Sequence, residues 1–314
     1  MLNLTLRQFR SIIAIHRAGK IASAAKALGL TAPAVTLQLK QMEEELGLAL
    51  FDRTSDGLRP TAAGFAALEC AQGIEDQLQD LSEQVEALTG ARKGTLRLGA
   101  VSTAKYFAPR LIAAFLKEYP GIKVDLQVGN RAETIDALRH HDLDIALMGR
   151  PPRDIAVRST VFGEHPLVII APSEHPLAHK RAISKEEIAK EAFLIRETGS
   201  GTRISLEIFF SDLPEKLDDL GTEMGSNETI KQAVMAGLGV AFISAHTIEA
   251  EMLLGRLAVL DVEGMPIRRQ WFSVSRQDRS SSPSMQAFND FLVREGPAHL
   301  PRIPGTERAP AITL

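Results

Sequence analysis

The first 42 residues carry the most distinctive charge pattern of this 314-residue chain. They contain six basic side chains and no Asp or Glu, whereas the whole chain has a formal net charge of −3. A positive block of this size is typical of a surface that binds a polyanion. The sequence therefore predicts a nucleic-acid interface at the N-terminus. The six side chains are Arg7, Arg10, Arg17, Lys20, Lys26 and Lys40.

A second set of polar residues lies in the C-terminal two thirds, at points where strand-like segments end or helices begin. In open parallel sheets these points bind ligands, because helix N-termini present unpaired N–H groups. The arginines and the lysine predict an anionic ligand, although each Ser or Thr taken alone fits a simple helix cap equally well. The predicted ligand residues are Ser102, Thr103, Lys105, Asn130, Arg131, Arg150, Thr198, Gly201, Thr202, Arg203, Asn227, Glu228 and Thr229.

The sequence contains no recognisable catalytic or metal-binding set. Neither a Walker A motif nor G-x-G-x-x-G occurs, and Cys70 is the only cysteine, which excludes an intrachain disulfide. His175 and His179 have helical spacing, but Pro176 favours a loop with surface histidines over a metal site. We expect no catalytic residue, no metal and no cofactor. An enzyme or a secreted solute-binding protein remains an alternative on the same kind of fold.

Three short helices are predicted to position the basic block. Apolar spacing predicts the first over 5–18, an Ala-rich helix follows up to Gly29, and Thr31 caps a third helix with Pro33 in its first turn. Helices two and three resemble a helix-turn-helix; an Ala-rich structural bundle is the alternative. On the third helix, small and polar residues are left to face a DNA groove. They are Thr31, Ala32, Pro33, Ala34, Thr36, Gln38 and Lys40.

A long helix is predicted over 61–89, because no proline or glycine-rich break interrupts it. From Ala71 to Leu88 the apolar positions advance by steps of 3, 4, 3, 4 and 3, which is the spacing of a coiled-coil seam. One chain offers few partners for such a seam, so a homodimer is predicted. Packing of the helix onto its own domain is the alternative.

The chain beyond a turn-forming hinge at 90–94 alternates between strand and helix patterns. Strands are predicted at 95–101, 123–129, 144–149, 166–172, 193–196, 240–244 and 271–275, which indicates a doubly wound α/β fold in two subdomains. The N-terminus lacks a signal peptide and no apolar stretch is long enough to span a membrane, so a cytoplasmic location without membrane contact is predicted. The Pro-rich segment 297–314 is predicted to be a flexible tail.

Three segments resemble the winged helix-turn-helix of LysR-type transcriptional regulators: LRQF (6–9), SAAKALGLTAPAVTLQLKQMEEELGLALFDR (23–53) and LRPTAAG (58–64). The resemblance implies a DNA-binding domain over 1–60 with a wing that places Arg53 and Arg59 near phosphates. It also implies a dimerisation helix over 61–89 and a tetramer that bends promoter DNA. The family commonly has Gln where this chain has Ala32.

The C-terminal region resembles the inducer-binding domain of the same family, with one subdomain over 95–163 and 268–296 and the other over 164–267. The segments VSTAKYFAPRL (101–111), VGNRAE (128–133) and MGRPP (148–152) are closer to the regulators of RubisCO and Calvin cycle operons. That resemblance implies promoter DNA as one partner and a small anionic metabolite as the other: ribulose 1,5-bisphosphate, phosphoenolpyruvate or NADPH.

Overall fold

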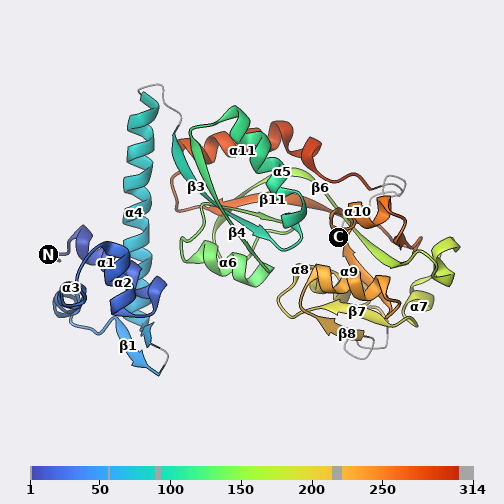
Figure 1. Cartoon of the computed structure of the whole chain (residues 1–314), viewed down its shortest axis with the longest axis horizontal. Helices are drawn as coiled ribbons and strands as arrows, with labels where there is room; N and C mark the ends of the chain where they lie inside the picture. Colours follow the sequence, from blue (N-terminus) through green and yellow to red (C-terminus); the bar gives the residue numbers. More distant parts are fainter. Residues whose placement is uncertain (1, 56, 89–92, 214–220, 304–314) are drawn as a thin grey trace. The chain divides into compact units, whose positions relative to one another are not determined.

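The computed structural model describes residues 2–55, 57–88, 93–213 and 221–303, and the side chains of 86–88 are left aside. The chain forms two compact units, Met1–Val85 and Glu86–Leu314, which are described separately (Figure 1). The hinge predicted at 90–94 lies largely outside the described residues. No helix among those described is long and apolar enough to cross a membrane.

The first unit is helical with one β-hairpin. Its first helix begins after Thr5, which forms a capping box with Gln8, and ends at Gly19 in the left-handed conformation. The structure thus confirms the three predicted short helices. The elements are α1 Leu6–Ala18, α2 Ile21–Leu28, α3 Ala32–Leu46, β1 Phe51–Thr54, β2 Gly57–Pro60 and α4 Ala62–Leu88.

One apolar core holds the first unit together. Ile12 and Ile15 of α1 and Val35 and Met42 of α3 are completely buried in it. Gly64 in the first turn of α4 lies so close to the hairpin region that a Cβ atom would be 2.0 Å from the carbonyl oxygen of Leu50. This close approach packs the start of α4 against the segment that leads from α3 into the hairpin, so the hairpin has a rigid support.

The helix α4 is 27 residues long, about 40 Å. Its N-terminal part packs into the core through Leu68 and Ala71, which are both buried. Further along, the predicted seam is open to solvent, because Leu78, Leu81 and Val85 are 36%, 57% and 53% exposed. A single chain therefore leaves the seam largely uncovered.

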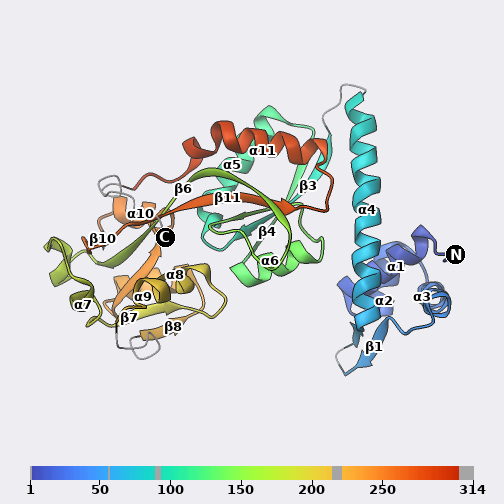
Figure 2. The same ribbon diagram turned by 180° about the vertical axis from the view of Figure 1, so that it is seen from behind.

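The second unit is built on one mixed sheet, with strand order β4-β3-β5-β11-β6-β9-β7-β8 and β10 beside β6 (Figure 2). The strands β3, β4 and β5 are parallel to one another, as are β7, β8 and β9. The strands are β3 Gly94–Val101, β4 Ile122–Gly129, β5 Ile145–Met148, β6 Val157–Pro172, β7 Phe193–Arg196, β8 Gly221–Met224, β9 Val240–Ser244, β10 Leu257–Val259 and β11 Ile267–Arg276.

Helices cover both faces of this sheet. In the half of the unit that contains β3, β4 and β5, the first half, α5 and α11 cover one face and α6 covers the other (Figure 1). The half that contains β7 to β10 is the second half. The helical segments are η1 Ala104–Tyr106, α5 Ala108–Glu118, α6 Arg131–Arg139, η2 Pro176–His179, α7 Lys185–Ile188, α8 Gly201–Phe209, α9 Asn227–Met235, η4 Ala245–Thr247, α10 Glu249–Leu253, α11 Pro283–Glu295 and η5 Gly296–His299.

The two halves are joined by the long antiparallel strands β6 and β11, which pair along nearly the whole length of β11 (Figure 2). Each half has cores of its own: one large cluster in the first half and two clusters on the two sides of the sheet in the second. The predicted α/β class with two subdomains is confirmed. The sheet is mixed, however, because β6 and β11 run antiparallel to each other.

The prediction of a flexible tail over 297–314 is wrong for its first part. Residues 296–303, which we call the strap, contain η5 and are packed onto both halves. Leu300 is 9% exposed within the core of the first half, and Ile303 is 3% exposed within that of the second. Gly163 of β6 makes room for Leu300, since a Cβ there would be 2.4 Å from the leucine Cδ1. Two isolated apolar residues give no periodic pattern, so the sequence could not indicate this packing. Residues 304–314 lie outside the described part.

Replacing Leu300 with Ala is expected to lower the free energy of unfolding of the second unit by about 2 to 4 kcal/mol, because it leaves a cavity between the strap and β6. Urea denaturation followed by circular dichroism would measure the loss. Leu254, which is 74% exposed, provides the control, and Leu254→Ala should stay within about 0.5 kcal/mol of the parent. Equal stabilities of the two variants would contradict the packing of the strap.

Candidate ligand pocket and nucleic-acid interface

The N-terminal turn of α3 presents the predicted DNA-facing residues to solvent. Thr31 accepts a hydrogen bond from the backbone N–H of Ala34 and caps the helix, and Ala32 and Pro33 are exposed. Ala34 is half-buried. Thr36 is exposed, but its hydroxyl donates to the carbonyl oxygen of Ala32 at 2.9 Å, which leaves it to act as an acceptor.

Two polar residues further along α3 have partners inside the unit. The hydroxyl of Ser11 donates to Gln38 Oε1, which holds this half-buried side chain against α1. Lys40 lies 3.4 Å from Glu44 in an exposed pair, which screening by water makes weak. The side chain of Lys40 can therefore still reach a phosphate, whereas that of Gln38 is held within the unit by its hydrogen bond to Ser11.

The hairpin carries the two predicted wing arginines, both exposed. Arg59 is paired across the hairpin with Asp52, and Arg53 is paired with Leu58. Directly paired residues lie on the same face of an antiparallel ribbon, so the two arginines lie on opposite faces. Arg10 of the basic block is bound by Glu75 of α4 at 2.7 Å, and this carboxylate raises the pKa of Arg10.

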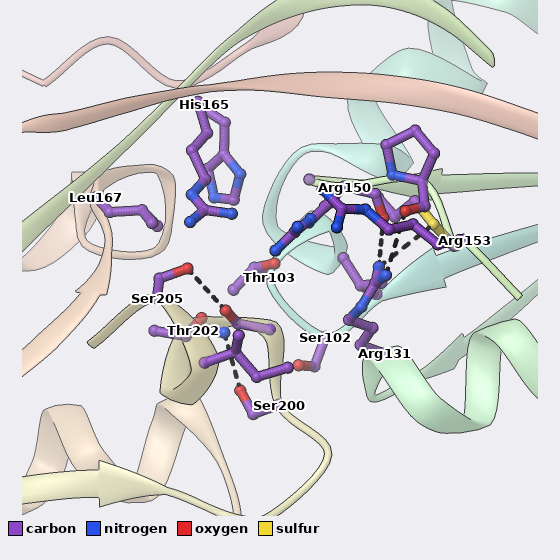
Figure 3. A pocket seen from close by; sticks show the side chains of 17 residues that line it. Ser102, Thr103, Arg131, Arg150, Arg153, His165, Leu167, Ser200, Thr202 and Ser205 are labelled. Atoms are coloured by element: carbon purple, nitrogen blue, oxygen red, sulfur yellow. Dashed lines mark hydrogen bonds between the residues drawn. The ribbon is translucent and has the colours of Figure 1, made fainter. Parts of the chain in front are cut away.

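The second unit contains a cavity of about 220 Å³ between its two halves. Figure 3 shows Arg131, Arg150 and Arg153 on one wall and the hydroxyl groups of Ser200, Thr202 and Ser205 on another. These side chains come from the loops after β3 and β5, the N-termini of α6 and α8, and the joining strands β6 and β11. The lining residues are Val101, Ser102, Thr103, Arg131, Met148, Gly149, Arg150, Pro151, Arg153, His165, Leu167, Ser200, Gly201, Thr202, Ile204, Ser205 and Arg269.

Four arginines and no acidic residue line this cavity. Arg131 donates to the carbonyl oxygens of Arg150 and Pro151. The pKa of Arg131 is lowered, mainly by burial and secondly by the charge of Arg150. The same two causes lower the pKa of Arg269. Within the described part of the chain, no hydrogen bond or ion pair holds the guanidinium of Arg269, and its Nε atom is buried. Guanidinium groups that lie close together, with no carboxylate among the lining residues, favour an anionic ligand.

A rigid aromatic cluster forms the wall of the cavity at the joining strands. The ring of His165 stacks on Trp271 with 3.9 Å between centroids, and its Nε2 lies 3.0 Å from the hydroxyl of Ser244. Trp271 in turn donates to Nδ1 of His246. Burial holds the pKa of His165 well below its ordinary value and lowers that of His246 to about 4. Both imidazoles are therefore neutral near pH 7, and the arginines supply the charge.

The structure brings only some of the predicted ligand residues together. Their positions at strand ends and helix starts are as expected, but only part of them line the cavity. Those that do are Ser102, Thr103, Arg131, Arg150, Gly201 and Thr202. Those that lie elsewhere are Lys105, Asn130, Thr198, Arg203, Asn227, Glu228 and Thr229.

These seven residues are outside the cavity for local reasons. Arg203 points to the other side of α8, where it pairs with Glu207 and Glu223 at 3.0 and 2.5 Å. Lys105 lies above the ring of Tyr106, and Thr198 is exposed. The remaining four act in helix caps and in hydrogen bonds within the protein. These are Asn130, Asn227, Glu228 and Thr229.

Sequence reasoning missed several lining residues. Ser200 and Ser205 flank predicted positions of the same loop and helix, so the Gly/Ser/Thr pattern could have included them. Arg153, His165 and Arg269 gave no comparable signal. Arg269 lies in a strand whose predicted start was residue 271, and only the pairing of β11 with β6 places it opposite His165. Among the described residues, no group of three or more His, Cys, Asp or Glu side chains could hold a metal ion.

Comparison with known proteins identifies both units. Residues 6–65 match the family described as bacterial regulatory helix-turn-helix protein, lysR family, and residues 89–297 match the LysR substrate binding domain. The chain is 61% identical over 301 residues to the HTH-type transcriptional regulator CbbR of Sinorhizobium medicae, covering 96% of each chain. It is 42% identical to the RuBisCO operon transcriptional regulator of Allochromatium vinosum, over 94% of this chain and 97% of that one.

A solved structure is similar to the second unit. The regulatory domain of CcmR from Synechocystis PCC6803, in complex with 2-PG, is 36% identical with a TM-score of 0.60, covering 64% of this chain and 97% of that one. The relatives named above are transcriptional regulators, and the two family matches together span most of the sequence. The chain therefore belongs to the LysR family of transcriptional regulators.

Proposed function

We propose that this LysR-type regulator controls a RuBisCO operon of CO2 fixation in response to a phosphorylated metabolite bound in the cavity of the second unit. The observation that carries the proposal is the lining of that cavity, with four arginines and no carboxylate. The pathway is supported by the identity of 61% to a CbbR and of 42% to a RuBisCO operon regulator. Such a regulator acts in the cytoplasm, where it meets promoter DNA.

The charge of the cavity favours a phosphate over a carboxylate. The charge of Arg150 lowers the pKa of both Arg131 and Arg269, and the charge of Arg269 also lowers that of Arg131, so the three side chains converge on one region. A phosphate group carries up to two negative charges and accepts paired N–H bonds from guanidinium groups. A cavity of about 220 Å³ favours compact ligands such as phosphoenolpyruvate or ribulose 1,5-bisphosphate over NADPH, since drug-sized ligands already need roughly 300 Å³ or more.

Thermal-shift titration of the purified chain tests the ligand. Ribulose 1,5-bisphosphate, phosphoenolpyruvate, NADPH and 2-PG are titrated, with citrate as a carboxylate control. At a concentration of 100 times the dissociation constant, a ligand that binds only the folded state adds about 2.7 kcal/mol of stability. We expect a saturable shift with at least one phosphorylated compound and none with citrate. A shift with citrate alone, or none in the panel, would contradict a phosphorylated effector while leaving DNA binding in place.

For the first unit, we propose that residues 1–60 bind promoter DNA and that the helix over 61–89 pairs two chains into a dimer, which assembles further into a tetramer. Support comes from the exposed face of α3, the two wing arginines and the solvent-exposed seam of α4. Two heads of a dimer bind two half-sites one helical turn apart. The ligand-binding subdomains are proposed to be 95–163 with 268–296, and 164–267.

The substitution Leu81→Glu in the seam is expected to shift the protein from dimer or tetramer toward monomer, because it places a charge where two apolar faces would meet. Analytical ultracentrifugation measures the oligomeric state. DNA affinity should fall with it by a factor of roughly 100 or more, since the second head is no longer tethered. Gln84→Glu, on the same helix at an exposed position, adds the same charge and should leave the assembly intact. An unchanged mass for the Leu81 variant would exclude this seam as the interface.

A further inference from the structure

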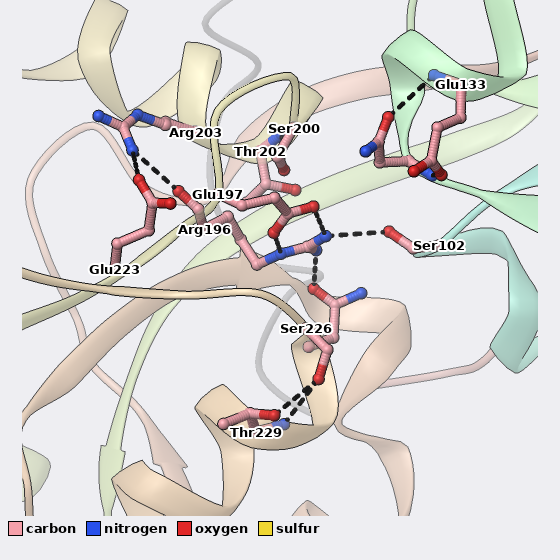
Figure 4. Close-up of polar contacts among 12 residues, drawn as sticks. Ser102, Glu133, Arg196, Glu197, Ser200, Thr202, Arg203, Glu223, Ser226 and Thr229 are labelled. Carbon is pink, nitrogen blue, oxygen red and sulfur yellow. Dashed lines mark hydrogen bonds and ion pairs between the residues drawn. The ribbon is translucent and has the colours of Figure 1, made fainter. Parts of the chain in front are cut away.

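A buried guanidinium joins three segments around the cavity. Arg196, the last residue of β7, is 3% exposed. Its Nε and Nη2 donate to the carboxylate of Glu197 at 2.6 and 2.7 Å, and its Nη1 donates to Oδ1 of Asn227 at the start of α9. Its Nη2 also donates to the hydroxyl of Ser102, at 3.2 Å, which belongs to the first half. Figure 4 shows Arg196 reaching from the second half toward Ser102.

A second polar link joins the halves next to the first. The hydroxyl of Tyr106, in η1 of the first half, donates to Glu228 Oε1 of α9 at 2.5 Å. Lys231 is 3% exposed and lies 3.2 Å from Glu228 and 4.7 Å from the centre of the Tyr106 ring. Burial and the neighbouring Glu228 raise the pKa of Tyr106, so the hydroxyl keeps its proton. We call the contacts Ser102–Arg196 and Tyr106–Glu228 the latch.

Three of the four latch residues lie outside the lining of the cavity. Ser102 lines it, whereas Arg196, Tyr106 and Glu228 do not, and every bond of the latch joins two protein groups. The Tyr106–Glu228 contact, which contains no lining residue, therefore favours contact between the halves by the same amount whichever ligand is bound. Glu228 was predicted from the sequence to bind the ligand, but in the structure it belongs to the latch.

We propose that Arg196 and Tyr106 are positioning residues that set effector affinity by holding the two halves together. The inference rests on the proposed function, in that the ligand binds between the halves. If the binding-competent arrangement has population f, the observed dissociation constant equals the intrinsic constant divided by f. Breaking the latch lowers f, so all ligands weaken by one common factor. Loss of a cavity arginine instead weakens a ligand in proportion to the charge that it places there.

Calorimetric titration of full-length variants with two probes of different charge tests whether breaking the latch weakens all ligands by one common factor. The probes are inorganic phosphate and ribulose 1,5-bisphosphate, and the variants are Tyr106→Phe and Arg196→Gln. We expect each variant to raise both dissociation constants by the same factor, about tenfold. Lys180→Gln serves as the control, because the ion pair of Lys180 with Glu187 lies within the second half and involves no residue of the latch, and it should change neither constant. Unequal factors for the two probes, or unchanged constants, would overturn the proposal.

A ligand-independent measurement separates the latch from the proposed function. Spin labels at Lys123→Cys and Leu253→Cys, both exposed and on opposite halves, are introduced in a Cys70→Ser background. Mixing with excess unlabelled chain leaves only distances within one chain. Without ligand, Tyr106→Phe should lengthen or broaden the distance distribution, while Lys180→Gln should not.

An unaltered distribution in the Tyr106 variant would reject the latch even if the ligand binds. An altered distribution in a protein that binds none of the phosphorylated compounds would reject the proposed effector and keep the latch. Tyr106→Phe removes a single hydroxyl, so it tests the proposal even if Arg196→Gln does not fold. Retention of the parent distances by Arg196→Lys would show that the cation at this position suffices for the latch.

Discussion

The variant Arg269→Gln is expected to bind the proposed phosphorylated effector about 100-fold more weakly than the parent protein. Hydrogen bonds to charged groups contribute roughly 1.5 to 3 kcal/mol each, and 1.4 kcal/mol corresponds to a factor of ten in affinity. Arg269 lines the cavity, and among the described residues no acidic side chain forms an ion pair with it. In the proposed function, the bound anionic ligand neutralises this charge. Isothermal titration calorimetry measures the loss.

The adjacent residue supplies a matched control. Arg268 precedes Arg269 on β11, but it does not line the cavity and pairs with Glu164 at 2.9 Å. Arg268→Gln should leave the dissociation constant within a factor of about two, because an ion pair with an exposed carboxylate contributes little. A similar loss in both variants would mean that strand β11, and not the arginine facing the cavity, determines affinity.

The unliganded Arg269 variant should also be no less stable than the parent. Burial and the charge of Arg150 both lower the pKa of Arg269, so its positive charge is disfavoured at this position. Removing it relieves that repulsion. Loss of ligand affinity together with equal or higher thermal stability is the result expected for a binding group. A large loss of stability would indicate that Arg269 is a structural residue.

The variant Ala32→Glu is expected to lose at least about 100-fold in affinity for promoter DNA. Ala32 is exposed at the first position of α3, on the face proposed to enter the major groove. A carboxylate there meets the negative potential of DNA. The same carboxylate is favourable near a helix N-terminus, so the fold should be retained. Fluorescence anisotropy with a labelled promoter fragment at fixed salt measures the loss.

Gln84→Glu again provides the control, since it adds one negative charge at an exposed position near the C-terminal end of α4. It should lower DNA affinity less than threefold, the small effect expected from a distant screened charge. Effector binding should be unchanged in both variants. If Ala32→Glu binds DNA as well as the parent, the N-terminal turn of α3 does not enter the groove.

The elements that the sequence predicted well are those with local causes. The first three helices begin and end at residues such as Thr5, Gly19 and Thr31, whose capping bonds involve only near neighbours. The central strands of each half are continuous apolar runs, and β7 and β9 have the predicted bounds. Capping bonds and apolar spacing depend only on residues close together in the sequence, so they can be recognised without a structure.

The elements that were missed depend on partners far along the chain. The N-terminal half of β6 has the polar sequence VRSTVFGE and becomes a strand because β11 pairs with it. The strap is ordered because Leu300 and Ile303 pack into the cores of the two halves, although its proline content predicted a flexible tail. Pairing and burial of this kind have no local pattern.

The sequence alone determined where charge and small residues gather: a basic helix-turn-helix, an apolar seam, and polar residues at strand ends. The tertiary structure decided which of those polar residues meet. Arg268 and Arg269 are neighbours in the chain, yet only Arg269 lines the cavity, because successive side chains of a strand point to opposite faces. Arg203 was predicted at the site but turns to Glu223. Register and helix rotation direct each side chain, and both are set by packing between segments distant in sequence.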